Sequence, residues 1–242
     1  MNNCLFLIII FLCNIIQGIT GFAGTILAMP LSIILVGFNV AKPILNILGI
    51  LSGLYVFLYC YKNVKWNELK RILIIMIPGI MCGIYLKRFF IGRESYFYKT
   101  FGAFVIILAI NGLYKIYKNK KINSSNKLFE FLLLILSGII HGMFVSGGPL
   151  LIGYLSKRIE DKVSFRATIS TVWIILNSII FIDDFKGGLI IGSTIKFLII
   201  TIPFLFMGMF IGSKLYSRMS QSLFMKLTYI LLIISGISLF VK

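Results

Sequence analysis

The 242 residues are 59% hydrophobic, with a mean hydropathy of +1.02, and only 13% of them are charged. A soluble domain of this length cannot hide so much apolar surface, so the composition excludes a soluble globular protein. The net charge of +17 would suit a nucleic-acid-binding protein, but the lysines and arginines lie in short clusters between long uncharged runs, as they do at the ends of membrane-spanning segments.

Uncharged runs divide the whole chain, and each predicts a membrane-spanning helix. A span needs about 20 apolar residues, and the shorter runs reach that length once a flanking lysine or arginine extends back to the interface. None of the runs alternates with a period of two, which excludes barrel strands. The sequence therefore predicts an all-α polytopic membrane protein with about eight transmembrane helices. The runs cover residues 1–41, 43–61, 72–86, 100–114, 131–156, 167–182, 197–213 and 227–241.

The first uncharged run is too long for one straight helix. A helix over residues 1–41 would measure about 60 Å, twice the roughly 30 Å of the hydrocarbon core. Glycine weakens a helix and accepts unusual dihedral angles, so we expect the break within the glycine-rich residues 18–24. For the same reason residues 131–156 are expected to break at 146–149. Both segments are thus predicted to be glycine-broken or re-entrant.

The two broken segments are copies of each other. Residues 17–32 read QGITGFAGTILAMPLS, and residues 141–156, 124 positions later, read HGMFVSGGPLLIGYLS. Similar pairs continue down the chain, which predicts two homologous repeats within one integral membrane domain. The repeats cover residues 1–118 and 128–242, joined by a polar linker at 119–127. A duplicated, broken hydrophobic segment indicates the substrate site of a transporter.

The broken segments also predict the charge of the ligand. A half-helix that begins inside the membrane presents free N–H groups and the positive end of its dipole, which together bind anions. The alternative is that the glycines only allow close helix packing. His141 aligns with Gln17, and both could hydrogen-bond a ligand or cap the break; a histidine held by a neighbouring carbonyl is the other interpretation. The predicted substrate-binding residues are Gln17, Gly18, Gly21, Gly24, Thr25, Asn46, His141, Gly142, Ser146, Gly147, Gly148 and Ser170.

Two matched cations open the helices that follow the glycine motifs. Lys42 and Arg166 could attract an anion at the mouth of a cavity, or they could be anchors at the membrane interface. No acid lies in the middle of a span, and no metal-ligand or catalytic motif is present. We therefore expect neither an enzyme nor a cofactor, a metal or catalytic residues.

The motifs resemble those of the TauE/SafE sulfite exporter family, also called DUF81 or TSUP. The resemblance rests on paired motifs of the form G-x-x-G-x-G-G-x(5)-P, on the basic residue after each and on a P-G-x(3)-G segment at 78–83, and it covers nearly the whole chain. The first motif keeps Pro30 but has Ala23 and Thr25 in place of glycines. The second keeps its glycine pair but has Tyr154 where the family often has proline.

The resemblance implies a transporter in a bacterial-type plasma membrane. Its expected cargo is a small anion such as sulfite, an organosulfonate or a related sulfur-containing or carboxylate anion, carried by alternating access at a site between the two glycine motifs. An anion channel on the same scaffold and a non-transporting membrane scaffold protein are the alternatives. The expected partners are the anionic solute and the lipid bilayer, with a homodimer as a further option and no nucleic acid. Parallel and inverted repeats are both compatible with the sequence.

Overall fold

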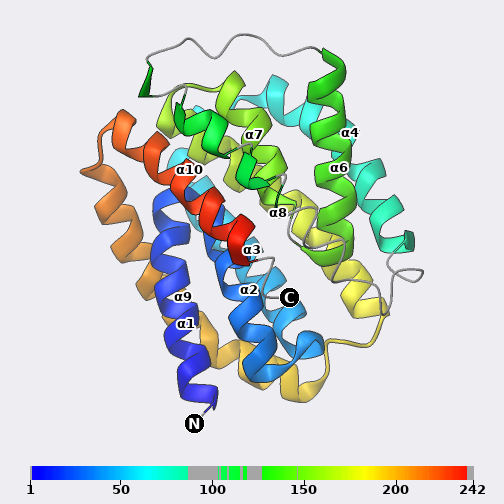
Figure 1. Cartoon of the computed structure of the whole chain (residues 1–242). Helices are drawn as coiled ribbons and strands as arrows, with labels where there is room; N and C mark the ends of the chain where they lie inside the picture. Colours follow the sequence, from blue (N-terminus) through cyan, green and yellow to red (C-terminus); the bar gives the residue numbers. More distant parts are fainter. Residues whose placement is uncertain are drawn as a thin grey trace. The chain divides into compact units, whose positions relative to one another are not determined.

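A computed structural model describes residues 2–86, 103, 105–107, 109–114, 117–118, 127–145 and 147–238, and contains helices but no strand over these residues (Figure 1). The predicted all-α class is confirmed. Ser146 and residues 119–126 of the predicted linker lie outside the described residues. The helices are α1 (Asn2–Thr20), α2 (Ala23–Val36), α3 (Phe38–Cys60), the short 3₁₀ helix η1 (Tyr61–Asn63), α4 (Trp66–Leu86), α6 (Lys127–Phe144), α7 (Gly148–Arg158), α8 (Lys162–Lys186), α9 (Gly192–Ser217) and α10 (Gln221–Ser238).

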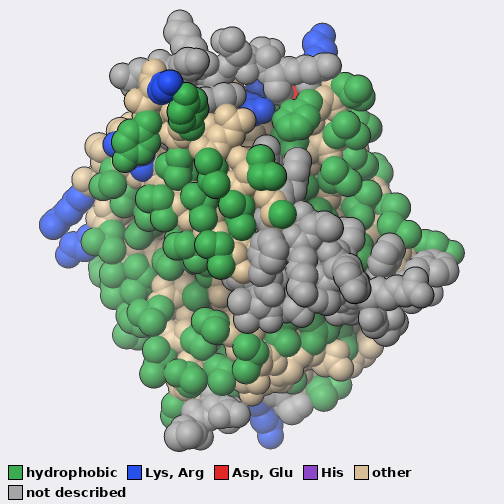
Figure 2. Space-filling view, in the orientation of Figure 1, with side chains coloured by type: hydrophobic (Ala, Val, Ile, Leu, Met, Phe, Trp, Pro, Cys, Tyr) green, Lys and Arg blue, Asp and Glu red, His purple; other side chains and the backbone are tan. Residues whose placement is uncertain are grey.

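Four of these helices are long and apolar enough to cross a membrane alone: α3 with its 3₁₀ extension, α4, α8 and most of α9. Shorter apolar helical stretches cover Cys4–Thr20, Ala23–Val36, Val105–Tyr114 and Gln221–Ile234. Hydrophobic side chains dominate the described surface in view, and lysines and arginines are few on it (Figure 2). Such a surface is stable only against lipid, as expected for a multi-pass membrane protein.

The chain forms two compact units, and each unit takes segments from both predicted repeats. Unit 1 consists of Met1–Val64 and Arg166–Met219, and unit 2 of Lys65–Phe165 and Ser220–Lys242. Helix boundaries follow the offset of the repeat: α1 and α6 end 124 positions apart, and α3 and α8 begin 124 positions apart.

Within unit 1, α1 and α9 run side by side in the same direction. Phe6 stacks on Phe197 near the start of both helices, with ring centroids 5.0 Å apart. Near their ends, a Cβ added at Gly18 would lie 2.8 Å from the carbonyl oxygen of Met209 and 3.0 Å from the Cα of Gly212. The two backbones therefore approach so closely that only glycine fits.

Within unit 2, α4 and α6 repeat this arrangement. A Cβ added at Gly79 would lie 2.8 Å from the carbonyl oxygen of Ile135, and one at Gly142 would overlap the carbonyl of Ile80. Gly18 and Gly142, which the repeat matches, thus both lie at a close helix crossing. Close packing is the observed role of these two glycines, as the alternative interpretation of the motifs states.

Both predicted helix breaks are present. In unit 1 the chain leaves the helix at Gly21, which has a φ of +82°, and α2 starts two residues later. In unit 2, α6 ends at Phe144, Val145 has a φ of 54°, and α7 begins at Gly148. Pro149 lies in the first turn of α7, where a missing N–H group costs no helical hydrogen bond.

Candidate functional site

Side chains of unit 1 satisfy the start of the half-helix α2. Thr20 Oγ1 accepts hydrogen bonds from the backbone N–H groups of Phe22 and Ala23, at 3.3 and 3.1 Å. Gln17 Oε1 accepts one from the N–H of Gly24, at 2.8 Å. These three donors are therefore not open to a ligand, and the expectation of free N–H groups is wrong for them. Of the two roles considered for Gln17, the structure shows the cap.

The capped break is also tied to α3. Gln17 Nε2 donates to Ser52 Oγ at 3.2 Å, and Ser52 Oγ donates to the carbonyl oxygen of Gly49 at 3.0 Å. A Cβ added at Gly49 of α3 would lie 3.7 Å from Thr25 Oγ1. Thr25, a predicted site residue, therefore also lies against α3. The first glycine motif is thus held rigidly by buried polar contacts.

The second glycine motif, in unit 2, is packed rather than capped. Ser137 Oγ donates to the carbonyl oxygen of Gly147 at 2.7 Å, and the N–H of Val145 donates to the carbonyl of His141 at 2.8 Å. A Cβ added at Gly147 would overlap the backbone carbonyl of Ser137 and lie 2.8 Å from the Cβ of His141. His141, Gly142, Gly147 and Gly148 are all buried around this break.

A row of buried polar residues runs between α3 and α8 in unit 1. We call this row the polar seam. Its contacts show that the two helices are antiparallel, because residues with increasing numbers along α3 contact residues with decreasing numbers along α8. At one end Lys42 is paired with Asp184, and in the middle Asn46 Nδ2 donates to the carbonyl of Asn177 at 3.1 Å. At the far end a Cβ added at Gly53 would lie 2.8 Å from the carbonyl of Ser170. The members of the seam are Lys42, Asn46, Ser170 and Arg166.

The two cations of the seam have different partners. Lys42 is buried and forms an ion pair with the carboxylate of Asp184, whose side chain is 1% exposed. Arg166 is only 5% exposed, yet it has no carboxylate within ion-pair distance among the described residues. Its Nη2 donates to Ser213 Oγ at 2.7 Å, and its guanidinium lies 4.4 Å from the ring centroid of Tyr216. The interpretation of these cations as interfacial anchors is wrong, because both are buried within the protein.

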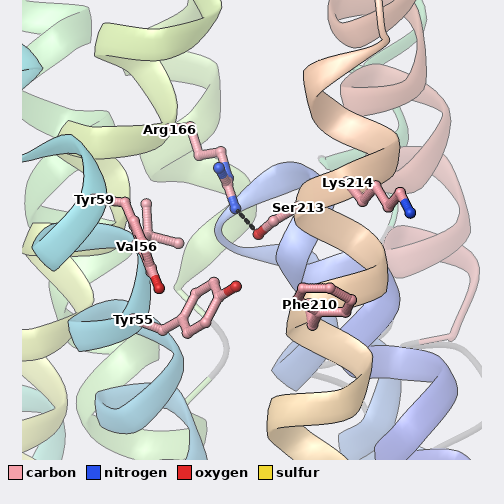
Figure 3. A pocket seen from close by; sticks show the side chains of 7 residues that line it. All are labelled: Tyr55, Val56, Tyr59, Arg166, Phe210, Ser213 and Lys214. Carbon is pink, nitrogen blue, oxygen red and sulfur yellow. Dashed lines mark hydrogen bonds between the residues drawn. The ribbon is translucent and has the colours of Figure 1, made fainter.

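The guanidinium of Arg166 borders a cavity of about 360 Å³ (Figure 3). This volume lies within the usual range for small-molecule sites. Arg166 extends from α8 toward Ser213 on α9, and the rings of Tyr55 and Tyr59 project from α3. The cavity is lined by Tyr55, Val56, Tyr59, Arg166, Phe210, Ser213 and Lys214.

The first helix break passes directly behind this cavity. A Cβ added at Gly21 would lie 2.7 Å from Ser170 Oγ and 3.2 Å from Cγ of Arg166. The Oγ of Ser170 and the Nε of Arg166 are both buried without a hydrogen-bond partner among the described residues. Unfilled polar groups of this kind mark a place where a ligand is expected. Two predicted site residues, Gly21 and Ser170, therefore lie next to each other, and Gly21 packs against Arg166, which lines the cavity.

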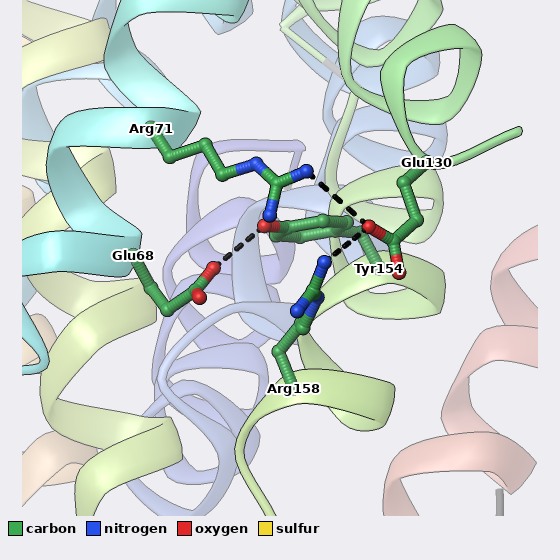
Figure 4. A network of polar contacts seen from close by, with 5 residues as sticks. All are labelled: Glu68, Arg71, Glu130, Tyr154 and Arg158. Atoms are coloured by element: carbon green, nitrogen blue, oxygen red, sulfur yellow. Dashed lines mark hydrogen bonds and ion pairs between the residues drawn. The ribbon is translucent and has the colours of Figure 1, made fainter. Parts of the chain in front are cut away.

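A separate polar network in unit 2 is electrically balanced (Figure 4). Glu130 accepts hydrogen bonds from both Arg71 and Arg158, and the hydroxyl of Tyr154 donates to Glu68 at 2.6 Å. Each guanidinium also lies 5.9 Å from the centroid of the Tyr154 ring. Two carboxylates offset two guanidiniums, so this network binds α4, α6 and α7 together and leaves no charge for a ligand.

The sequence singled out Arg166 as a matched cation but did not place it among the site residues. It gave no signal for Tyr55, Tyr59 and Ser213, because nothing local indicates that their helices meet. It also placed no acid at mid-span. Two acids near helix ends, Glu130 and Asp184, are nevertheless buried, each neutralised by a basic partner.

Comparisons with known proteins agree with the membrane architecture. The sequence profile of the family described as Sulfite exporter TauE/SafE matches residues 6–239. One curated relative, the "Probable inner membrane transporter protein TsaS" of Comamonas testosteroni, is 30% identical over 105 residues, which is 43% of this chain and 44% of that protein. The match thus spans less than half the length of the relative, and no solved structure matches. Because the family profile covers nearly the whole chain, this multi-pass plasma-membrane protein belongs to the TauE/SafE sulfite exporter family of membrane transporters.

Proposed function

We propose that this protein carries a small anion across the plasma membrane and that Arg166 binds the anionic group of the cargo. The proposed cargo is sulfite, an organosulfonate or a related sulfur-containing or carboxylate anion. One observation carries the proposal: Arg166 is a buried guanidinium beside a cavity, with no carboxylate partner among the described residues. A buried charge without a counter-ion is costly, and an anion from solution relieves that cost. Membership of a transporter family supports the proposal.

The site proposed here differs from the one expected from the half-helix dipoles. In unit 1 the glycine motif contributes shape, because Gly21 lets the chain turn against Ser170 and Arg166. The positive charge comes from a side chain. The bond that Arg166 donates to Ser213 is one that the oxyanion of the cargo can replace.

The membrane potential favours one direction. An interior-negative potential drives an anion outward by about 2.3 kcal/mol per charge per 100 mV. Export under this proposal therefore needs no tightly coupled ion, whereas uptake would need one.

Replacement of Arg166 tests the proposal. Arg166→Gln removes the charge but keeps hydrogen-bonding groups, and Arg218→Gln is the matched control because Arg218 is exposed on the same unit. A charge-assisted hydrogen bond contributes about 1.5–3 kcal/mol, so anion affinity should fall about 10- to 100-fold in Arg166→Gln and stay unchanged in the control. The measurements are thermal stabilisation and flux into liposomes with sulfite, sulfate, thiosulfate, sulfoacetate, taurine and acetate. A folded Arg166→Gln protein that moves its anion normally would overturn the assignment.

The same measurements separate the alternatives. A channel would conduct ohmic currents that do not saturate with anion concentration, whereas a transporter saturates at low turnover. A non-transporting scaffold protein would show neither flux nor stabilisation by any anion of the panel.

A further inference from the structure

The polar seam has two ends that the repeat relates to each other. At the offset of 124 positions, Lys42 near the start of α3 matches Arg166 near the start of α8. The same offset matches Cys60, the last residue of α3, with Asp184 near the end of α8. Since α3 and α8 are antiparallel, each cation comes close to the far end of the partner helix. Arg166 and Cys60 are therefore the positions that correspond to the ion-paired Lys42 and Asp184.

The two ends differ in one chemical group. Asp184 supplies a carboxylate to Lys42, and both side chains are 1% exposed, so this end is a complete and buried ion pair. At the other end, Tyr216, Cys60 and Tyr55 lie within electrostatic range of Arg166. None of these three side chains carries a carboxylate. The Arg166 end thus has a cation in the same role but, among the described residues, no carboxylate paired with it.

The cavity lies at the Arg166 end of the polar seam. Cys60 is not one of the seven lining residues, but it directly follows Tyr59, which is. The cavity is therefore lined by Arg166 and by the residue that precedes the position corresponding to Asp184. Lys214, the other cation of the lining, is exposed and points away from Arg166 (Figure 3). Arg166 is the cation that faces the cavity.

Resting on the proposed function, we infer that the cargo pairs with Arg166 in the same way that the carboxylate of Asp184 pairs with Lys42. The site therefore selects an oxyanion group that carries a single charge, which is a carboxylate or a sulfonate. One guanidinium offsets one negative charge. Its paired N–H donors match two oxygens of the same group, which favours an oxyanion over other anions. A dianion would bring a second charge that only Lys214, exposed and directed away from Arg166, could offset. The site therefore rejects sulfate.

An internal carboxylate at position 60 is the direct test. Cys60→Asp places an acid beside Arg166, as Asp184 lies beside Lys42, and Cys60→Asn is the control of equal shape without charge. The probe is methanesulfonate, added to the purified full-length protein in detergent, with sulfate as the dianion. We expect Cys60→Asp to weaken methanesulfonate binding at least tenfold more than Cys60→Asn does. Sulfate should bind the parent at least tenfold more weakly than methanesulfonate.

A second measurement needs no acidic variant. Cys4 and Cys82 are exposed and Cys13 is buried, so a Cys4→Ser/Cys82→Ser protein reports mainly on the half-buried Cys60. Methanesulfonate should slow the alkylation of Cys60 at least threefold, and sulfate at equal ionic strength should not. This labelling decides the question if Cys60→Asp does not fold.

The outcomes distinguish this inference from the proposed function. If Cys60→Asp binds methanesulfonate as the parent does, or if sulfate binds and protects equally well, the inference is overturned. The proposed function still stands in that case, provided that Arg166→Gln abolishes anion binding. If no anion of either charge stabilises the parent, and Arg166→Gln melts and transports as the parent does, the proposed function itself is overturned.

Discussion

Gly21 shows what a single residue contributes to the site. Its φ of +82° is costly for any residue with a Cβ, by about 1–2 kcal/mol, and an added Cβ would also press on Ser170 and Arg166. Gly37, between α2 and α3, has a similar φ of +78° but nothing within 4 Å of an added Cβ. Gly21 and Gly37 thus share a demand on backbone conformation, and of this pair only Gly21 is packed against Arg166, which lines the cavity.

Alanine at these two glycines separates backbone strain from damage to the site. Gly21→Ala and Gly37→Ala should both lower the melting temperature, because both adopt a positive φ. Only Gly21→Ala should also weaken anion binding, about tenfold or more, since the methyl group displaces Ser170 and Arg166. Thermal melts with and without methanesulfonate measure both effects. Equal loss of binding in the two variants would contradict a special position for Gly21.

At the scale of elements, the two half-helices are held by different means. The start of α2 is capped by Gln17 and Thr20, whereas the end of α7 is held by the network around Tyr154. Pro30 occupies the position of Tyr154 in the first repeat. The first repeat therefore has no tyrosine at this position, and the two copies have the same break but not the same support.

Removal of the Tyr154 hydroxyl tests how much this network stabilises unit 2. Tyr154→Phe loses the hydrogen bond to Glu68 and should cost about 1 kcal/mol. That corresponds to a decrease of about 2–4 °C in melting temperature for a chain of this size. Tyr61→Phe is the control, because Tyr61 is exposed and outside the network. An unchanged melting temperature in Tyr154→Phe would show that the network does not support α7.

At the scale of the whole molecule, the antiparallel packing of α3 and α8 bears on the direction of the repeats. These helices are matched by the repeat, both are long enough to span a membrane, and they run in opposite directions within unit 1. Matched helices that cross in opposite senses are typical of inverted repeats. The charges agree: residues 62–71 hold four cations, whereas the last turn of α8 has Lys186 beside two acids. The excess of positive charge predicts that residues 62–71 face the cytoplasm.

Cysteine labelling tests this inverted arrangement. Asn63→Cys and Lys186→Cys, each in a variant whose four native cysteines are serine, place one thiol after α3 and one at the end of α8. A membrane-impermeant maleimide should label Lys186→Cys in intact cells and Asn63→Cys only after the cells are permeabilised. Labelling of both thiols from the same side would exclude inversion.

The sequence by itself determined the properties that depend on local pattern. Hydropathy and charge spacing predict the membrane class, and the glycines at 18–24 and 146–149 predict both helix breaks, because each depends only on neighbouring residues. The repeat also marked Lys42 and Arg166 as equivalent. The tertiary structure alone decided their partners: Asp184 for one, and Ser213, Tyr216 and a cavity for the other. Apolar helix surfaces resemble one another, so the sequence of a helix does not specify which helix packs against it, and charges far apart in the chain are paired only by that packing.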